Sequence, residues 1–329
     1  MGMELVSKKT MQLLTGRTHP ELAQEIAIHL GVELGETNLA DFANSEINCR
    51  FGESVRGSDV FIVQSHSMVG DRSVNDSLME QWIMIDAAKR ASAKRITAVC
   101  PYYGYSRQDR KSQGREPITA KLVADLLKSA GANRVVSVDL HSGQIQGFFD
   151  GPFDHLTALP VLVDYLRQHL AHDVVVVAPD AGRIKAAERF SRHLGSDMAS
   201  VYKRRKVGVV NQVEALAVMG EVQGRQCVIV DDMIDTAGTV VAAADQLKER
   251  GAAEVWAVAT HGVFSGSAID RLKASVIDRV VVTDTLPLPA EKQIDKLEVL
   301  SVAQLIADAI DAVFEDASVS EIFGGENQS

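Results

Sequence analysis

One segment of the sequence combines carboxylates, hydroxyls and small residues in a short space. It reads Cys227-Val-Ile-Val-Asp-Asp-Met-Ile-Asp-Thr-Ala-Gly-Thr239, and a helical pattern follows over residues 240–250. A strand, a turn of small residues and a helix start expose backbone N–H groups that have no partner within the helix. These groups, together with the hydroxyls of Thr236 and Thr239, are suited to bind a phosphate.

The carboxylates of this segment need a different partner, because they would repel a phosphate. Asp231, Asp232 and Asp235 can accept hydrogen bonds from the hydroxyl groups of a sugar, or they can bind a divalent metal. A phosphorylated sugar satisfies both the turn and the carboxylates. The alternative is an ordinary acidic N-cap before a helix, which one aspartate would explain better than three aspartates with two threonines.

A second candidate segment is Arg107-Gln108-Asp109, which follows a predicted strand over residues 96–100 and a turn over residues 101–104. Loops at the carboxyl ends of strands are where α/β sheets bind ligands. Arginine offers a planar fork for phosphate oxygens, and glutamine can both donate to and accept from a purine edge. The alternative is a solvated basic turn.

Two further candidates follow predicted strands. His141 comes after the strand over residues 135–139, and Asp180 comes after the strand over residues 174–178. An imidazole and a carboxylate at the ligand edge of a sheet can hold a hydrated magnesium ion that bridges polyphosphate oxygens. A lone histidine with a structural role is the alternative.

Four cations stand together at Lys203-Arg-Arg-Lys206, before an irregular stretch over residues 207–212. On an acidic protein such a group can neutralise the concentrated charge of phosphates during a reaction. The alternatives are an exposed loop or a nucleic-acid contact. The net charge of −10 and the absence of interleaved aromatic residues argue against nucleic acid.

Several of these motifs carry a family resemblance. The segment from Asp231 to Thr239 resembles the ribose-5-phosphate loop shared by phosphoribosyltransferases and ribose-phosphate pyrophosphokinases. Three other segments resemble the pyrophosphokinases and are not features of the transferases: Tyr105-Ser-Arg-Gln-Asp-Arg-Lys111, Asp139-Leu-His-Ser-Gly-Gln-Ile-Gln-Gly-Phe-Phe149 and Gly52-Glu-Ser-Val-Arg-Gly57. The resemblance covers residues 11–323, nearly the whole chain.

The resemblance implies a reaction and its residues. The pyrophosphoryl group of Mg-ATP passes to the C1 hydroxyl of ribose 5-phosphate, giving 5-phosphoribosyl 1-pyrophosphate and AMP for nucleotide biosynthesis, with Mg²⁺ as cofactor. The implied ribose-5-phosphate contacts are Asp231, Asp232, Asp235, Thr236, Ala237, Gly238 and Thr239, and the implied ATP contacts are Phe42, Asn44, Ser45, Glu46, Arg107 and Gln108. The implied magnesium contacts are His141 and Asp180, and the implied catalytic loop carries Lys203 and Arg205.

The resemblance also implies assembly and regulation. The segment around Phe42 matches a hairpin that reaches ATP across a subunit boundary, so a homo-oligomer, a hexamer in the family, is expected. A regulatory site for ADP or phosphate is implied at Ser54, Arg56, Ser92, Arg115, Ser318 and Ser320. One departure is Arg183, where many family members have a glycine. A phosphoribosyltransferase and a noncatalytic regulatory homologue are the alternatives to the pyrophosphokinase.

The elements that must position these residues alternate between short β-branched runs and longer helical patterns, which predicts an α/β fold with mainly parallel sheets. Strands are expected at residues 11–15, 60–64, 96–100, 135–139 and 174–178, and helices at residues 20–30, 79–87, 120–130, 159–170 and 240–250. Proline at residue 20 suits a first helical turn.

A weak internal repeat predicts two domains of one architecture. Residues 55–63 resemble residues 222–230, residues 93–99 resemble residues 252–258, and residues 134–139 resemble residues 279–284, in the same order. With the family resemblance, this predicts two phosphoribosyltransferase-like domains, an N-terminal one over residues 11–152 and a C-terminal one over residues 153–314. The resemblance also implies that the helix starting near Ser301 and the segment over residues 315–325 pack back onto the N-terminal domain.

The composition agrees with such a chain. A length of 329 residues suggests about two domains at ~150 residues each. Three cysteines without CxxC spacing indicate neither a disulfide framework nor a zinc cluster, which favours a reducing cytoplasm. The sequence has no run of about 18 apolar residues, and the first ten residues lack a signal-peptide core, so neither secretion nor membrane anchoring is expected.

Overall fold

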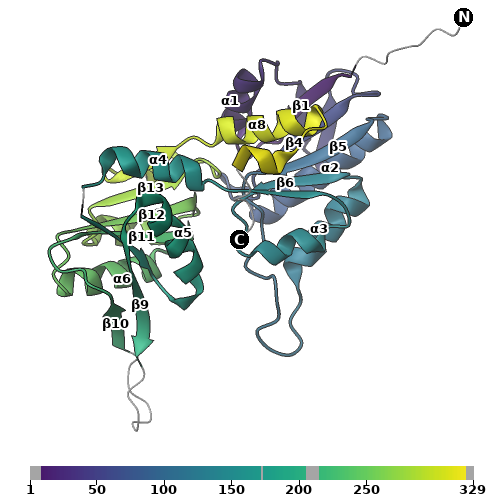
Figure 1. The fold of residues 1–329 in the computed structure, drawn as a ribbon. Coiled ribbons are helices and arrows are strands. Elements are labelled where there is room, and N and C mark those ends of the chain that lie inside the picture. Colours follow the sequence, from purple (N-terminus) through teal and green to yellow (C-terminus); the bar gives the residue numbers. More distant parts are fainter. Residues whose placement is uncertain (1–8, 172, 205–214, 324–329) are drawn as a thin grey trace, which may run out of the picture. The chain divides into compact units, whose positions relative to one another are not determined.

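The computed structural model describes residues 9–171, 173–204 and 215–323. The chain forms two compact units, each built around one sheet. Unit 1 contains Met1–Thr157, Thr285–Pro287 and Ala303–Ser329, and unit 2 contains Ala158–Asp284 and Leu288–Val302. Figure 1 shows the helices and strands of both units, coloured along the sequence.

The sheet of unit 1 has five parallel strands in the order β1-β4-β5-β6-β7. Their bounds are β1 (Met11–Thr15), β4 (Asp59–Val63), β5 (Arg95–Cys100), β6 (Arg134–Val138) and β7 (Phe153–Leu156). Strand β4 is buried at every position, as is usual for a parallel strand covered on both faces. A separate antiparallel hairpin consists of β2 (Thr37–Asp41) and β3 (Ile47–Phe51).

Helices α2 (Val74–Arg90) and α3 (Thr119–Ala130) pack on one face of this sheet. Ile85 of α2 and Val123 of α3 belong to one buried cluster with Ile62 and Ala98 of the sheet. Helix α2 begins with a capping box in which Ser73 and Asp76 bind each other's backbone N–H groups. The apolar spacing seen in the sequence therefore corresponds to the face that meets the sheet.

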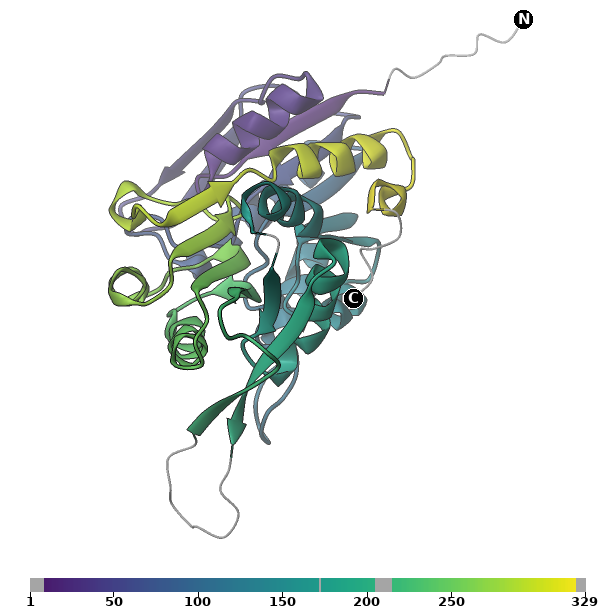
Figure 2. The same cartoon turned by 60° about the vertical axis from the view of Figure 1, so that its left-hand side comes forward.

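Helices α1 (Pro20–Leu30) and α8 (Ala303–Phe314) complete unit 1. Helix α1 contacts β1, helix α8 contacts β7, and the two helices pack against each other. Figures 1 and 2 both show the yellow helix α8 beside the purple helix α1, although these helices lie far apart in the sequence. Since β1 and β7 are the two edge strands, α1 and α8 together span the sheet.

The sheet of unit 2 has seven strands in the order β10-β9-β8-β11-β12-β13-β14, and only the β9–β10 pair is antiparallel. The bounds are β8 (Val174–Ala178), β9 (Asp197–Arg204), β10 (Ala215–Met219), β11 (Gln226–Ile234), β12 (Glu254–Gly262), β13 (Arg279–Thr283) and β14 (Leu297–Leu300). The helices are α4 (Leu159–His169), α5 (Ile184–Leu194), α6 (Gly238–Glu249) and α7 (Ala268–Ala274).

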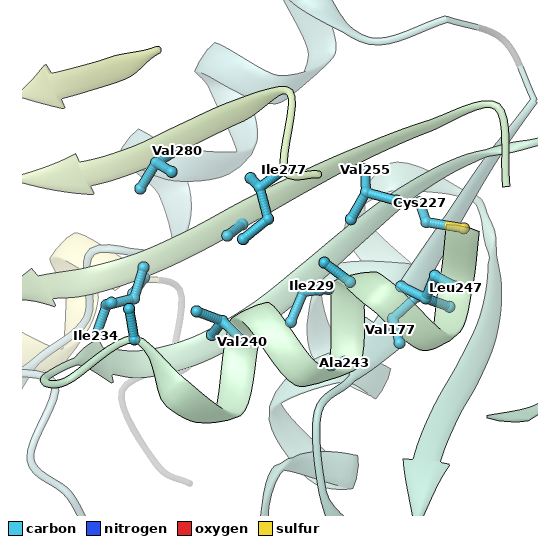
Figure 3. Close-up of a cluster of buried hydrophobic side chains, with 14 of the residues drawn as sticks. Val177, Cys227, Ile229, Ile234, Val240, Ala243, Leu247, Val255, Ile277 and Val280 are labelled. Atoms are coloured by element: carbon cyan, nitrogen blue, oxygen red, sulfur yellow. The ribbon is translucent and has the colours of Figure 1, made fainter. Parts of the chain in front are cut away.

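Helices α6 and α7 bury one face of this sheet. Figure 3 shows Val240, Ala243 and Leu247 of α6 turned toward Ile229 and Val177 of the strands. Because side chains alternate along a strand, the intervening buried valines of β8 face the other side of the sheet. Helix α5 contacts β8, β9 and β11. The fold is therefore α/β, with parallel sheets flanked by helices.

The two sheets share one strand order. The order β1-β4-β5-β6-β7 of unit 1 corresponds to β8-β11-β12-β13-β14 of unit 2, to which β9 and β10 are added at one edge. The three repeated sequence segments fall on equivalent strands: β4 with β11, β5 with β12 and β6 with β13. The weak repeat in the sequence thus corresponds to two similar domains.

The division between the units differs from the predicted one in two places. Strand β7 pairs with β6, so residues 153–156 lie in unit 1 and not in the C-terminal domain. Helix α8 falls within the residues assigned to the C-terminal domain, but it packs on α1 and belongs to unit 1, as the resemblance implied for the helix starting near Ser301. Beyond α8, Asp316 forms ion pairs with Lys9 and Arg95. Within the described residues, no helix has the length and apolar character needed to cross a membrane.

Candidate functional site

The turn between β11 and α6 in unit 2 has the geometry of an anion site. Strand β11 runs on to Ile234, two residues past the acidic pair, and α6 begins at Gly238. Between them Ala237 has a φ of 60°, a left-handed conformation that is uncommon for a residue other than glycine and that concentrates at functional sites. Thr236, Gly238 and Thr239 are exposed, and the first N–H groups of α6 point out of the helix here.

The loop after β12 supports this turn from behind. The backbone N–H groups of Val263 and Phe264 donate to Ile234 O, and Ser265 N donates to Asp235 O at 2.9 Å. A Cβ atom on Gly262 would lie 2.6 Å from the ring of buried Phe264, so a side chain there would displace the ring. The turn is therefore held in place before any ligand arrives.

Arg271 of α7 lies at the same turn and was not among the predicted site residues. Its Nη1 donates to Thr236 O at 2.8 Å, and the guanidinium is exposed. This adds a cation beside the exposed hydroxyls. The sequence contained no signal for it, since Arg271 occupies an ordinary position in a short helical pattern well beyond Thr239.

The acidic pair behind the turn is bound by an arginine. Arg183 Nε lies 2.6 Å from Asp231 Oδ1, and Arg183 Nη2 lies 2.6 Å from Asp232 Oδ1. Burial raises the pKa of Asp231, the neighbouring Asp232 carboxylate raises it further, and Arg183 opposes both effects. The sequence pointed to Asp231 and Asp232 as partners of hydroxyl groups, but it did not reveal their ion pairs with Arg183.

Asp180 stands at the carboxyl end of β8, in the same unit as the acidic pair. Its side chain caps the turn Ala181–Arg183, where Oδ1 accepts a hydrogen bond from Gly182 N at 2.8 Å. The residue is exposed. A fixed and exposed carboxylate at the end of a parallel strand is a suitable ligand for a hard cation.

In unit 1, two loops that carry predicted site residues are joined by Asp109. This buried carboxylate accepts hydrogen bonds from Ser142 Oγ at 2.6 Å and from Gln144 Nε2 at 2.7 Å. Gln108 is exposed, and its Oε1 accepts from Thr119 Oγ1 at 2.6 Å. Arg107 is exposed as well. The structure thus ties the Arg107 loop to the loop that contains His141.

His141 is half-buried in the loop that follows β6. The preceding Leu140 donates its N–H to His155 Nε2 at 2.8 Å, and Asp139 has a φ of 36°. His141 lies in unit 1 and Asp180 in unit 2, so the structure describes each only within its own unit. Among the described residues, no group of three or more His, Cys, Asp and Glu side chains is arranged to hold a metal ion.

The β2–β3 hairpin carries the other predicted ATP contacts. Its turn is closed by hydrogen bonds from Phe42 N to Glu46 O and from Ser45 N to Phe42 O, both 2.8 Å. Ser45 has a φ of 69°, and Asn44 Oδ1 accepts from Glu46 N. The side chain of Phe42 is 58% exposed at the hairpin tip. A large exposed aromatic ring there suits a stacking contact better than a place in a core.

Two arginines fix the root of this hairpin. Arg17 and Arg72 both bind the carboxylate of Asp41 and both bind Glu80, whose side chain is fully buried. Gln64 Nε2 also donates to Glu80, at 2.9 Å. We call Arg17, Asp41, Arg72 and Glu80 the hairpin clamp. It was missed in the sequence because its members come from three separate parts of the chain, after β1, at the end of β2 and around the start of α2.

The structure describes the predicted regulatory residues but not the side chains of the predicted catalytic loop. Ser54, Arg56 and Ser92 are exposed around one turn, in which Arg56 N donates to Ser54 Oγ and Gly57 N donates to Ser92 O. Arg115 is exposed, and Ser318 and Ser320 are joined by a hydrogen bond of 2.9 Å between their hydroxyls. Lys203 lies on β9, but its side chain is not described, and Arg205 lies outside the described residues.

Comparison with known proteins agrees with this geometry. Residues 11–131 match the family model of the N-terminal domain of ribose phosphate pyrophosphokinase, and residues 196–324 match that of the phosphoribosyl synthetase-associated domain. The ribose-phosphate pyrophosphokinase of Streptomyces avermitilis is 54% identical over 98% of both chains, and that of Bifidobacterium longum is 56% identical over 96% of this chain and 93% of the relative.

A solved structure has the same fold. The crystal structure of phosphoribosylpyrophosphate synthetase from Mycobacterium smegmatis superposes with a TM-score of 0.88 at 50% identity, covering 94% of this chain and 100% of the other. Two α/β units of one strand order, one of them with an anion turn in front of an acidic pair, and relatives of this kind define a transferase of nucleotide metabolism. More narrowly, the chain belongs to the ribose-phosphate pyrophosphokinase family.

Proposed function

We propose that this protein transfers the pyrophosphoryl group of ATP to ribose 5-phosphate. The C1 hydroxyl attacks the β-phosphorus in line, a bond forms between that oxygen and phosphorus, and the bond to the AMP oxygen breaks. The hydroxyl proton is released, and the products are 5-phosphoribosyl 1-pyrophosphate and AMP. Holding the reactants aligned can supply ~7–11 kcal/mol of barrier reduction, so no covalent intermediate with the protein is needed.

The observation that carries the proposal is the turn before α6. Exposed hydroxyls of Thr236 and Thr239, outward N–H groups at the start of α6 and the left-handed Ala237 favour a phosphate monoester. Asp231 and Asp232 lie behind it on β11 and suit the hydroxyls of an attached ribose. Arg107, Gln108 and the Phe42 hairpin of unit 1 provide the phosphate-binding and ring-stacking chemistry that ATP requires.

Magnesium is part of the proposal, and the chain's own residues suit it. Asp180 offers an exposed carboxylate fixed by Gly182 N, and His141 offers a half-buried imidazole after β6. When bound, the ion would neutralise and orient the polyphosphate oxygens. We assign Lys203 and Arg205 of the family's catalytic loop to the charge that develops on the transferred group.

Assembly and regulation also belong to the proposal. The exposed Phe42 at the hairpin tip suits a contact with ATP bound to a neighbouring copy, so we propose a homo-oligomer, with the family's hexamer as the expected size. Ser54, Arg56 and Ser92 around one turn, together with Arg115, Ser318 and Ser320, are proposed to bind ADP or phosphate.

The test is an AMP-release assay with ATP, magnesium and ribose 5-phosphate, with and without inorganic phosphate, beside a mass measurement of the native assembly. We expect AMP and 5-phosphoribosyl 1-pyrophosphate in equal amounts, and none of either when ribose 5-phosphate is omitted. No AMP in the presence of phosphate would reject the proposal. Nucleotide formed from 5-phosphoribosyl 1-pyrophosphate and a free base, without ATP, would identify a phosphoribosyltransferase instead.

A variant links the activity to the turn. Thr239→Val removes one exposed hydroxyl and should raise the KM for ribose 5-phosphate by roughly tenfold, with the KM for ATP unchanged. The matched control is Thr37→Val, since the Thr37 hydroxyl has no hydrogen-bond partner in the described part of the chain. Equal effects of both substitutions would remove the turn from the proposed site.

A further inference from the structure

Arg183 of unit 2 has defined partners in the structure. It ends the turn Ala181–Arg183 and directly precedes α5. Its side chain turns toward β11, where it meets both members of the acidic pair.

Two nitrogens of the guanidinium group form these ion pairs. Nε and Nη2 each lie 2.6 Å from a different carboxylate, Asp231 and Asp232, at Oδ1 in both cases. Asp231 Oδ1 also accepts a hydrogen bond from Asp232 N at 2.8 Å. Only 18% of the Arg183 side chain is exposed, with 13% for Asp231 and 9% for Asp232. A planar fork that engages two shielded carboxylates fixes their orientation.

The acidic pair needs this cation. Asp231 and Asp232 are consecutive in sequence, both carry shielded carboxylates, and each disfavours the charge of the other. Without Arg183 the two carboxylates would separate, or one would take up a proton. After either change the two carboxylates could no longer both accept hydrogen bonds from neighbouring hydroxyls of one sugar ring.

We propose that Arg183 is a positioning residue for ribose 5-phosphate, which holds the Asp231 and Asp232 carboxylates side by side as acceptors for the ribose hydroxyls. The inference rests on the proposed function, in which these carboxylates bind the sugar. It deepens that function, because it makes the selection of ribose over a deoxygenated sugar depend on a residue that touches neither substrate. If Arg183 instead occupied the place of the ribose hydroxyls, its removal would strengthen the binding of ribose 5-phosphate.

The experiment compares Arg183→Gly, Arg183→Lys and the control Arg192→Ala with the unaltered protein. Arg192 lies on α5 as well, but its side chain is 65% exposed and contacts Glu188 at 3.5 Å. For Arg183→Gly we expect the KM for ribose 5-phosphate to rise roughly tenfold to a hundredfold, with the KM for ATP changed less than about twofold. Arg183→Lys should recover part of the affinity, because it restores the positive charge. The recovery should be incomplete, because one ammonium cannot engage both carboxylates as a fork.

A second readout separates positioning from a merely structural role. The ratio of kcat/KM for ribose 5-phosphate to that for 2-deoxyribose 5-phosphate should fall at least about fivefold in Arg183→Gly and stay unchanged in Arg192→Ala. Calorimetric binding of ribose 5-phosphate alone, without ATP, should weaken in parallel. An unchanged ratio, or tighter binding in Arg183→Gly, would overturn the inference.

The proposed function and this inference fail in different ways. If the unaltered protein releases no AMP, the proposed function fails, and the calorimetric comparison of ribose 5-phosphate binding still decides the role of Arg183. If the unaltered protein is active but Arg183→Gly binds and selects ribose 5-phosphate as before, only the inference fails.

Discussion

At the scale of single residues, a buried histidine holds the turn that leads to Arg107. Nδ1 of His66 accepts a hydrogen bond from Gly104 N at 2.9 Å, so the ring proton is on Nε2, which donates to Gln81 Oε1 at 2.8 Å. A Cβ atom on Gly104 would lie 2.8 Å from His66 Cβ, so the backbone approaches closely here. Protonated His66 would present a second N–H to the Gly104 N–H, and this turn therefore requires the neutral ring.

This contact predicts a pH dependence of stability. Burial lowers the pKa of His66 to about 4, against a smaller opposing effect of the Gln81 hydrogen bond. Because the folded pKa lies below the ordinary value of about 6.5, the contribution of His66 is complete above pH 6.5 and is lost as the pH falls toward 4. The loss amounts to about 3 kcal/mol of unfolding free energy. Urea unfolding at pH 7 and at pH 4 measures it.

The control for this prediction is a second histidine. His66→Gln should remove most of the difference between pH 7 and pH 4, whereas His29→Gln, at an exposed position in the last turn of α1, should preserve it. A His66→Gln protein with the same pH dependence as the unaltered one would show that other groups cause the acid sensitivity.

At the scale of elements, the hairpin clamp joins three parts of unit 1. Arg17 follows β1, Asp41 ends β2, and Glu80 lies within α2. Arg17 donates to Glu80 through Nε at 2.6 Å, and Arg72 donates through Nη2 at 2.8 Å. The Arg17 hydrogen bonds lower the pKa of Asp41 to about 2, so this carboxylate is charged at neutral pH. The hairpin that presents Phe42 is thereby fixed at its root.

Glu80→Gln should break this connection. The new amide has one oxygen and one NH₂ group, so at least one of the arginines or Gln64 would face a donor at a side chain that is fully buried. Breaking a buried ion pair on one side costs about 3–5 kcal/mol, and we expect a loss of that size in the free energy of unfolding by urea. The KM for ATP should also rise if the hairpin contacts ATP.

The matched control is Glu33→Gln, at an exposed position, which should change the free energy of unfolding by less than about 0.5 kcal/mol. If Glu80→Gln were as stable as this control, the clamp would be an incidental arrangement of surface arginines rather than a support of the hairpin.

At the scale of the whole molecule, the sequence predicted the strands and helices that a regular spacing of apolar residues indicates. The strands at Met11–Thr15 and Val174–Ala178, the helix that starts at Pro20 and the repeat of three segments all agree with the structure. The family was recognisable because its motifs are continuous in sequence, and the matching family models and relatives confirm it.

Contacts between distant segments could not be predicted in this way. The clamp, the Arg271 contact with Thr236 O and the ion pairs of Arg183 each join residues from separate elements, and no single window of sequence contains both partners. For α8, the family resemblance and not the apolar pattern indicated the return to the N-terminal domain. Its apolar pattern predicts a helix with a buried face, but the pattern does not say which sheet or helix covers that face.

Helix α8 follows the strands of unit 2 in the sequence but belongs to unit 1, and this assignment can be tested. Ile310 of α8 and Ile229 of β11 are both fully buried, the first in unit 1 and the second in unit 2. Replacing either with alanine should cost about 2–5 kcal/mol through lost burial and the cavity left behind. Hydrogen exchange then reports where the loss falls: Ile310→Ala should speed exchange in α1 and β7, which α8 contacts, and Ile229→Ala should speed it in β12 and β13, each with little change in the other unit. Faster exchange in β12 and β13 of the Ile310→Ala protein would mean that α8 stabilises unit 2, and the assignment of this helix to unit 1 would be wrong.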